Sequence, residues 1–285
     1  MKAKDNPFKE IKWIPTGFHA LDKILGGGIP HRKITECSGV WSVGKSTLAF
    51  QIVAQAQKQK LDTLWCDSEF SFSQEYAEKL GVDCDKLDLF AGRFAEENLD
   101  YMEEWAEAHK NSLIVLDSIG HLLPRAEAEK GADGKVIGGQ AKLIATFCRK
   151  ITPIITINNI ALLVLNHQFT DLMSGKLKTS GGAKLEYSKS IWLMLRQANK
   201  RIMKGDQQVG AIIHAEIRKN KLAPTQKQST ELTLLYGEGF SVKADRFQEL
   251  LDSGAITKKG STYWLGDQKL GVGANTAREA LPETA

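Results

Sequence analysis

Short apolar runs alternate along most of this chain with segments whose apolar residues recur every three or four positions. The runs predict buried strands, and the periodic segments predict amphipathic helices. Strands are expected at 33–37, 63–66, 87–90, 113–116 and 160–165, and helices at 47–58, 73–80, 98–109 and 139–157. Pro153 is expected to kink the last helix. Strands that alternate with helices predict an α/β fold, with a mostly parallel sheet covered by helices on both faces.

The pattern changes after residue 190, where three strand-like runs at 191–196, 210–217 and 231–236 are separated by turns. This spacing predicts an antiparallel extension of the sheet. Beyond Gly237-Glu238-Gly239, a helix at 247–251 and a hairpin from 254–256 and 263–265 predict a small C-terminal α+β domain. We therefore divide the chain into a short N-terminal segment (1–11), a core (12–238) and a C-terminal domain (239–285).

Composition narrows the class of protein without deciding it. The 285 residues are 42% hydrophobic and carry a net charge of +4, which permits nucleic-acid binding but does not argue for it. The four cysteines form no C-x-x-C pair, so neither a cysteine metal site nor a disulfide framework is expected. No apolar stretch reaches membrane length and the start lacks a signal-peptide core, so we expect a cytoplasmic protein without a membrane partner.

The strongest chemical signal is a glycine-rich loop between a predicted strand and a predicted helix. It follows the pattern G-x-x-x-x-G-K-S and consists of Gly39, Val40, Trp41, Ser42, Val43, Gly44, Lys45 and Ser46. Glycines let the backbone N–H groups converge on a phosphate, while Lys45 adds a charge and the Ser46 hydroxyl can hold Mg²⁺. Thr47 follows in the first turn of a helix whose positive end faces the same anion. The loop predicts a nucleoside triphosphate site.

Carboxylates end two of the predicted strands. Asp117 follows the run 113–116 and is placed to hold Mg²⁺. Glu69 and Asp67 follow the run 63–66, and either one could orient or deprotonate the water that attacks a γ-phosphate. Their chemistry alone leaves that choice open. Two glycine-rich stretches at 129–139 and 170–182 are longer than ordinary connections, and loops of this length are usually functional or disordered.

In order and spacing, these motifs resemble the bacterial RecA recombinase family, with this chain as a divergent member. The resemblance runs from about residue 12 to the end, through 16–17, the phosphate loop, 67–69, 76–83, 117–118, 123–127, 166–168, 181–182, 219–224 and 236–239. It implies a RecA-like P-loop ATPase core that uses ATP and Mg²⁺. It also implies that Glu69 is the catalytic base, that Tyr76 stacks on adenine, and that Gln168 senses the γ-phosphate. Lys219 and Lys221 would reach the γ-phosphate held by a neighbouring subunit.

The resemblance assigns DNA binding to the two glycine-rich stretches. The candidate contacts are Ile137 and Met173 (or Leu172) as wedges between bases, and Lys142, Arg149, Lys176 and Lys178 on phosphates. Five features depart from the family pattern: the usual N-terminal arm is largely missing, the acidic C-terminal tail is absent, Trp41 replaces a polar residue, the second glycine-rich stretch is short, and His167 stands beside Gln168. The last of these leaves the alignment there open by one residue.

The resemblance implies a DNA-dependent ATPase that assembles as a helical filament on single-stranded DNA. Such a protein would pair that strand with homologous double-stranded DNA and promote recombination and repair. The alternative is a RecA-like regulatory or loader ATPase without strand exchange. A hexameric helicase is disfavoured by the segment 219–221 and by the compact C-terminal region.

Overall fold

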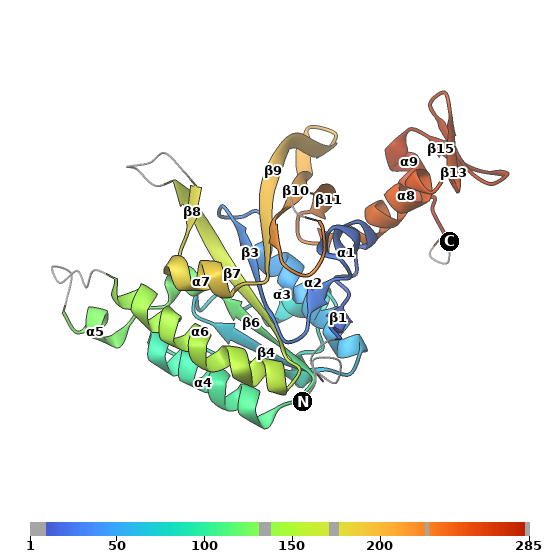
Figure 1. Ribbon diagram of the computed structural model, residues 1–285. Helices are drawn as coiled ribbons and strands as arrows, with labels where there is room; N and C mark the ends of the chain where they lie inside the picture. The colour runs from blue at the N-terminus through green and yellow to red at the C-terminus, as the bar shows by residue number, and fades with distance from the viewer. Residues whose placement is uncertain (1–9, 131–137, 171–176, 226–227, 283–285) are drawn as a thin grey trace.

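The computed structural model describes residues 10–130, 138–170, 177–225 and 228–282 (Figure 1). A ten-stranded sheet lies at the centre, in the order β12-β11-β10-β9-β3-β7-β6-β4-β5, with β8 paired to β7. The strands are β3 (Ile34–Gly39), β4 (Asp62–Asp67), β5 (Leu87–Phe90), β6 (Ser112–Asp117), β7 (Ala161–Thr170), β8 (Leu177–Thr179), β9 (Ile191–Lys204), β10 (Gln207–Asn220), β11 (Ser229–Leu235) and β12 (Gly239–Phe240). The strands from β9 to β5 run parallel, and β10, β11 and β12 continue antiparallel.

Helices cover both faces of the parallel part. The helices of this region are α1 (His19–Leu25), which packs on β10 and β11, and α2 (Lys45–Lys58), α3 (Gln74–Lys79), α4 (Ala95–Ala108), α5 (Arg125–Ala128), α6 (Gly139–Ile157) and α7 (Gly182–Ser188), with the 3₁₀ turns η2 (Cys84–Lys86) and η3 (Ile119–His121). Figure 1 shows α4 and α6 side by side on one face. The helix α6 runs through Pro153 to Ile157. The predicted α/β fold is confirmed.

Neighbouring residues of the central strands pack into two separate hydrophobic cores, because successive side chains of a strand point to opposite faces of the sheet. On β6, Leu113 and Val115 pack with α2, whereas Ile114 and Leu116 pack with α4 and α6. All four side chains are fully buried. A strand buried on both faces reads as a continuous apolar run, which is why 113–116 could be recognised in the sequence.

The antiparallel extension is larger than the sequence predicted. Strands β9 and β10 form a ribbon of two 14-residue strands that continues well beyond the predicted runs 191–196 and 210–217. The outer half of the ribbon is mostly exposed, so its residues lack the apolar pattern on which the prediction relied. The short strands β1 (Trp13–Ile14) and β2 (Ile29–Pro30) were not predicted and form a sheet of their own.

The C-terminal region has its own small core and projects from the side of the sheet near α1 (Figure 1). It contains α8 (Val242–Asp252), α9 (Ala274–Glu279) and a sheet of β13 (Ile256–Lys259), β14 (Thr262–Leu265) and β15 (Gln268–Val272). A three-stranded sheet thus replaces the predicted hairpin. Asp245 joins α8 to α1 by accepting the backbone N–H of His19 at 2.6 Å. The boundaries 1–11, 12–238 and 239–285 stay predictions.

The carboxyl ends of four neighbouring parallel strands bring the predicted chemistry to one edge of the sheet. Asp67 lies opposite Asp117 across β4 and β6, and Gly39 lies opposite His167 across β3 and β7. This is where ligands bind in open α/β sheets. Across the described residues, no helix combines the length and apolar character needed to cross a membrane.

Candidate functional site

The glycine-rich loop connects β3 to α2, and two of its glycines are required by the backbone. At Gly39, a Cβ atom would lie 2.8 Å from the Leu195 carbonyl oxygen and 2.6 Å from a methyl group of Val43. Gly44 is the N-cap of α2 and has a φ of 92°, a conformation that L side chains rarely adopt. The N-terminus of α2 therefore opens directly onto the loop, as a phosphate site requires.

Lys45 folds back across this loop. Its Nζ donates to the carbonyl oxygens of Gly39 and Val40, at 3.3 and 3.0 Å, and lies 3.4 Å from Nδ1 of His167. The side chain is only 6% exposed, and this burial lowers the pKa of Lys45. The ammonium group is held by weak neutral acceptors beside an open cavity, so an incoming phosphate would be a stronger partner.

Ser46 and Asp117 meet next to Lys45, where the Ser46 hydroxyl donates to Asp117 Oδ2 at 2.7 Å. Burial, with a smaller contribution from nearby carboxylates such as Glu69, raises the pKa of Asp117 to about 7 despite that hydrogen bond. A buried carboxylate and a hydroxyl are the hard oxygen donors that Mg²⁺ takes together with substrate phosphates. The two residues therefore fit the predicted metal role.

The raised pKa makes stability a test of the Asp117 environment. The ordinary pKa is 3.8, so Asp117 holds its proton more tightly in the folded state than in the unfolded chain. Protonated Asp117 therefore stabilises the folded state below about pH 4, and this contribution to the free energy of unfolding is lost as the pH rises to about 7. Asp117→Asn cannot lose a proton. In EDTA without nucleotide, we expect this variant to be more stable than the wild type above pH 7, by at most about 4 kcal/mol of unfolding free energy. Melting curves of the two proteins should converge toward pH 4, and a difference independent of pH would contradict this.

Asp67 and Glu69 have different environments. The carboxylate of Asp67 accepts the backbone N–H groups of Glu69, Ser71 and Phe72, at 2.8 to 3.1 Å. These bonds hold the turn that follows β4 and occupy both oxygens of Asp67. Glu69 instead reaches the cavity, so the geometry favours it as the base.

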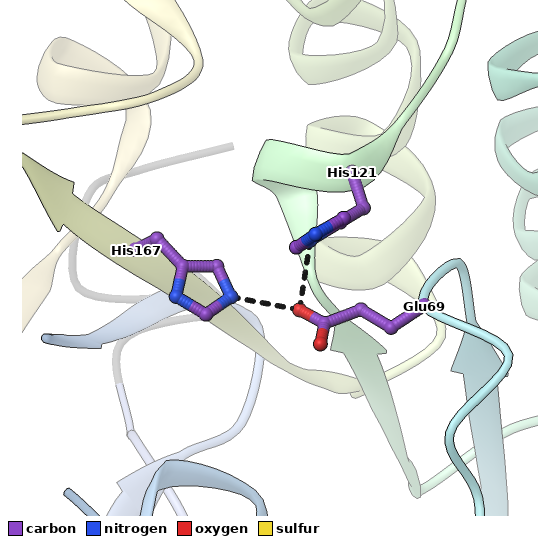
Figure 2. Close-up of side chains that lie close together, drawn as sticks. All are labelled: Glu69, His121 and His167. Carbon is purple, nitrogen blue, oxygen red and sulfur yellow. Dashed lines mark hydrogen bonds and ion pairs between the residues drawn. The ribbon is translucent and has the colours of Figure 1, made fainter. Parts of the chain in front are cut away.

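Glu69 lies at the centre of a polar cluster (Figure 2). Its Oε1 accepts the Ser118 hydroxyl at 2.5 Å and lies 2.8 Å from Nε2 of His167 and 2.9 Å from Nδ1 of His121. Burial alone would raise the pKa of Glu69, but the hydrogen bonds from Ser118 and His167 and the charge interaction with His121 together lower it. Glu69 is therefore ionised at neutral pH, as a proton acceptor must be.

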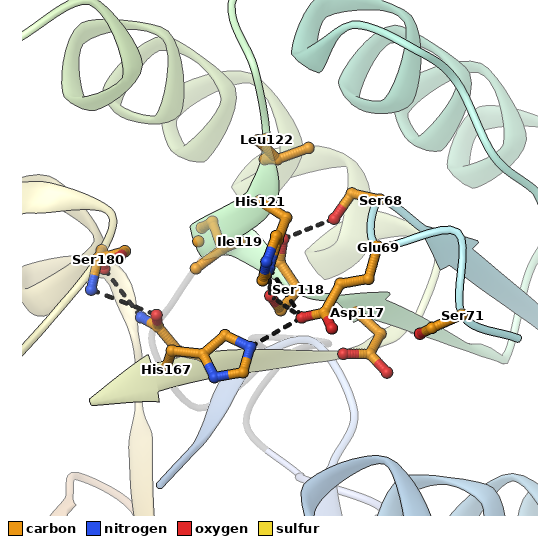
Figure 3. A network of polar contacts seen from close by, with 12 residues as sticks. Ser68, Glu69, Ser71, Asp117, Ser118, Ile119, His121, Leu122, His167 and Ser180 are labelled. Carbon is orange, nitrogen blue, oxygen red and sulfur yellow. Dashed lines mark hydrogen bonds and ion pairs between the residues drawn. The ribbon is translucent and has the colours of Figure 1, made fainter. Parts of the chain in front are cut away.

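Ser68 ties this cluster to the sheet, as Figure 3 shows. The Ser68 hydroxyl donates to the Ser118 carbonyl oxygen at 2.6 Å, and the Ser118 hydroxyl donates to Glu69. These bonds join the segments after β4 and β6 beyond Asp67 and Asp117, the last residues that pair between the two strands. They fix the position of the Glu69 carboxylate relative to Asp117.

Gln168 does not face the cavity, and this corrects its predicted position. Successive residues of β7 point to opposite faces. The Gln168 amide donates to Ser38 Oγ at 3.1 Å on one face, while His167 reaches Lys45 and Glu69 on the other. Since an ammonium can only donate, His167 Nδ1 accepts from Lys45 and Nε2 donates to Glu69. His167 therefore takes the place expected for the glutamine.

A cavity of about 680 Å³ joins these groups, which is within the range of small-molecule sites. Tyr76 lies on its wall with its hydroxyl 3.1 Å from Thr47 Oγ1, and Trp41 on the loop is 81% exposed. The sequence reasoning did not assign some of the lining residues to the site. These are Gln197, Leu234, Leu235, Tyr236 and Gly237, of which the last two belong to the motif at 236–239.

Comparison with known proteins identifies the family of this chain. The model of the RecA N-terminal domain matches residues 1–241. Proteins named "Protein RecA" are similar over nearly the whole chain. The one from Thermus aquaticus is 34% identical over 287 residues, covering 99% of this chain and 84% of the relative. The relative from Aquifex aeolicus is 34% identical over 278 residues (96% and 80%), and that from Chlorobium limicola 35% identical over 279 (96% and 79%). The chain belongs to the RecA family.

The two lysines that the family resemblance places at a subunit interface lie away from the cavity of their own chain. Lys219 of β10 pairs with Trp192 of β9, and Trp192 in turn pairs with Glu36 of β3. Glu36 precedes the start of the phosphate loop at Gly39 by three residues, so Lys219 lies back along the sheet from the loop. Lys219 donates to the Glu186 carbonyl oxygen, and Lys221 donates to that of Tyr187 at 2.8 Å. Partial burial, with the neighbouring charge of Lys221, lowers the pKa of Lys219.

The candidate DNA contacts of this RecA-family chain are described only in part. Ile137, Leu172, Met173 and Lys176 lie outside the described residues. Lys142 is exposed in the first turn of α6, and Lys178 is exposed on β8, where it pairs with Phe169 of β7. Arg149 lies seven residues beyond Lys142 on α6, about 10 Å along the axis, so it stands apart from the loop that precedes the helix.

Proposed function

We propose that this chain is a DNA-dependent ATPase of the recombinase type. It binds single-stranded DNA as a helical filament and pairs that strand with homologous duplex, and ATP hydrolysis releases the product. One observation carries the proposal: Lys45, the Ser46–Asp117 pair and Glu69 converge on one cavity at the sheet edge, in a chain of the RecA family.

The residues divide the chemistry of hydrolysis among them. The N–H groups of the loop and Lys45 bind the β- and γ-phosphate oxygens and stabilise the charge that grows there in the transition state. Ser46 and Asp117 would hold Mg²⁺, which would neutralise phosphate charge. Glu69 takes the proton of the attacking water, and the hydrogen bonds from Ser118 and His167 keep its carboxylate aligned.

Tyr76 and Trp41 line the same cavity, and we propose that Tyr76 packs against the adenine ring. The Tyr76 ring already packs edge-on against Phe50, with centroids 6.3 Å apart, which fixes its orientation. The site is completed by Lys219 and Lys221 of a neighbouring protomer. This explains why these lysines are found away from their own phosphate loop.

Electron microscopy tests the assembly directly. The protein would be mixed with single-stranded DNA and a non-hydrolysable ATP analogue, with ADP as the matched control. A helical filament that forms with the analogue and not with ADP supports the recombinase. A closed ring, or the absence of any assembly, would contradict it and favour a helicase or a regulatory ATPase.

DNA binding should depend on salt through the second glycine-rich stretch. We expect the Lys176→Ala/Lys178→Ala double variant to bind single-stranded DNA more weakly. Its plot of log affinity against log salt should be shallower by about 1.4, because each lost phosphate contact removes about 0.7. Fluorescence anisotropy of a labelled oligonucleotide measures both quantities. The control is Lys58→Ala/Lys110→Ala. These two exposed lysines lie at the end of α2 and just before β6, on the side of the sheet where the parallel strands begin. Equal slopes in the two variants would contradict the assignment.

A further inference from the structure

Two histidines and a carboxylate from three separate segments meet beside the phosphate cavity (Figure 2). Glu69 follows β4, His121 is the last residue of η3, and His167 lies on β7. One nitrogen or oxygen of each residue lies within 4.8 Å of the other two. In the part of the chain that the structure describes, this is the one group of three or more histidine, cysteine, aspartate or glutamate side chains close enough together to hold a metal ion.

The donor set differs from that of the Mg²⁺ position. Ser46 and Asp117 offer only hard oxygens, whereas the cluster offers two imidazole nitrogens and one carboxylate, a set suited to Zn²⁺. The two imidazole rings are inclined by 77°, with centroids 5.2 Å apart. Figure 2 shows their nitrogens reaching the Glu69 carboxylate from different sides. Ligands that converge from different directions are what a tetrahedral ion requires.

The cluster would leave a fourth position open. Glu69 and His167 line the phosphate cavity, whereas His121 does not line it and has a side chain that is 53% exposed. An ion held by these three side chains would therefore be accessible to solvent on the side of His121. Its opposite side would face the phosphate cavity. Three protein ligands with one open position are typical of zinc sites that contact a substrate.

We propose that Glu69, His121 and His167 form a Zn²⁺ site, adjacent to the Mg²⁺ position and chemically distinct from it. The regulatory consequence rests on the proposed function. Zn²⁺ takes the Glu69 lone pair that would otherwise accept a proton from water. It also takes the Nε2 lone pair of His167, whose proton moves to Nδ1 and ends the hydrogen bond from Lys45. Zn²⁺ occupancy and ATP hydrolysis therefore exclude each other. Removal of the ion by a chelator restores the base.

Stoichiometry tests the site without reference to activity. The 285-residue chain would be dialysed against Zn²⁺ in an excess of Mg²⁺ and its metal content measured by mass spectrometry. We compare the wild type, His121→Asn, and a matched control, His109→Asn, at the far end of α4. The wild type and the control should hold one Zn²⁺ more per chain than His121→Asn. The cysteines are the same in all three proteins, so any Zn²⁺ that they bind adds equally to each measurement and does not affect the difference. Equal zinc content in the three proteins would overturn the site.

Inhibition tests the consequence. With Mg²⁺ in excess throughout, Zn²⁺ should suppress ATP hydrolysis by the wild type and by His109→Asn, and a zinc-selective chelator that leaves Mg²⁺ free should reverse the effect. Each activity is expressed relative to the same protein in chelator. The half-inhibitory Zn²⁺ concentration should rise at least about 10-fold in His121→Asn, because losing only a residue that supports a metal ligand already costs about 10–100-fold in affinity. Activation by Zn²⁺, or equal inhibition of His121→Asn, would overturn mutual exclusion. A wild type that is inactive in the zinc-selective chelator with excess Mg²⁺ would instead overturn the proposed ATPase, and the stoichiometry would still decide the site.

Discussion

The Glu69→Gln protein is expected to bind ATP and to hydrolyse it about 10²–10⁴-fold more slowly than the wild type. The amide has the shape of the carboxylate and can still accept hydrogen bonds from Ser118 and His167, but it cannot take the proton of the attacking water. Lys45→Ala should behave differently and lose ATP binding itself, because the lysine supplies the charge at the β/γ-phosphates. Circular dichroism should show both proteins folded.

Binding of radiolabelled ATP and single-turnover hydrolysis, both with single-stranded DNA present, separate the two outcomes. The control is Asp67→Asn. Its carboxylate accepts three backbone N–H groups, so this change should lower the melting temperature while hydrolysis persists. If Asp67→Asn trapped bound ATP and Glu69→Gln did not, the assignment of the base would be wrong.

The choice between these two acids shows where sequence reasoning ends. Both residues follow a predicted strand, and their spacing alone favours neither. The structure distinguishes them because the turn after β4 points its N–H groups at Asp67 and leaves Glu69 to reach the cavity. A turn conformation of this kind depends on the packing around it. By contrast, the phosphate loop and the buried strand 113–116 are local patterns, and the sequence was sufficient to predict both.

Gln168 and His121 show two other limits. A shift of one residue along a strand moves a side chain to the opposite face of the sheet. Because the alignment near His167 was open by one residue, the sequence could not tell whether His167 or Gln168 faces the cavity. His121 belongs to no motif, and it reaches Glu69 only because η3 places it there. The distal half of the β9–β10 ribbon was missed because exposed strands carry no apolar alternation.

The second large effect concerns Lys219 and Lys221. We expect the Lys219→Ala/Lys221→Ala protein to lose about 10³–10⁵-fold in DNA-dependent ATP hydrolysis, as is typical when a cation supplied by a neighbouring subunit is removed. Both lysines bind backbone carbonyls of the segment around α7 in their own chain and lie outside its ATP cavity, so nucleotide binding by the isolated protomer should persist. Wild-type activity should also rise more than linearly with protein concentration, because the complete site needs two protomers.

Mixing tests whether these lysines act across the interface. The Lys219→Ala/Lys221→Ala protein has an intact phosphate loop, and the Lys45→Ala protein has intact lysines. Each should be inactive alone. In a random equal mixture, about one quarter of head-to-tail interfaces combine both intact halves, so up to about a quarter of the wild-type activity should return. Co-sedimentation on single-stranded DNA confirms that the two proteins assemble together. If they co-assemble and no activity returns, the lysines do not complete a neighbour's site, and a regulatory ATPase that does not need this contact becomes the better explanation.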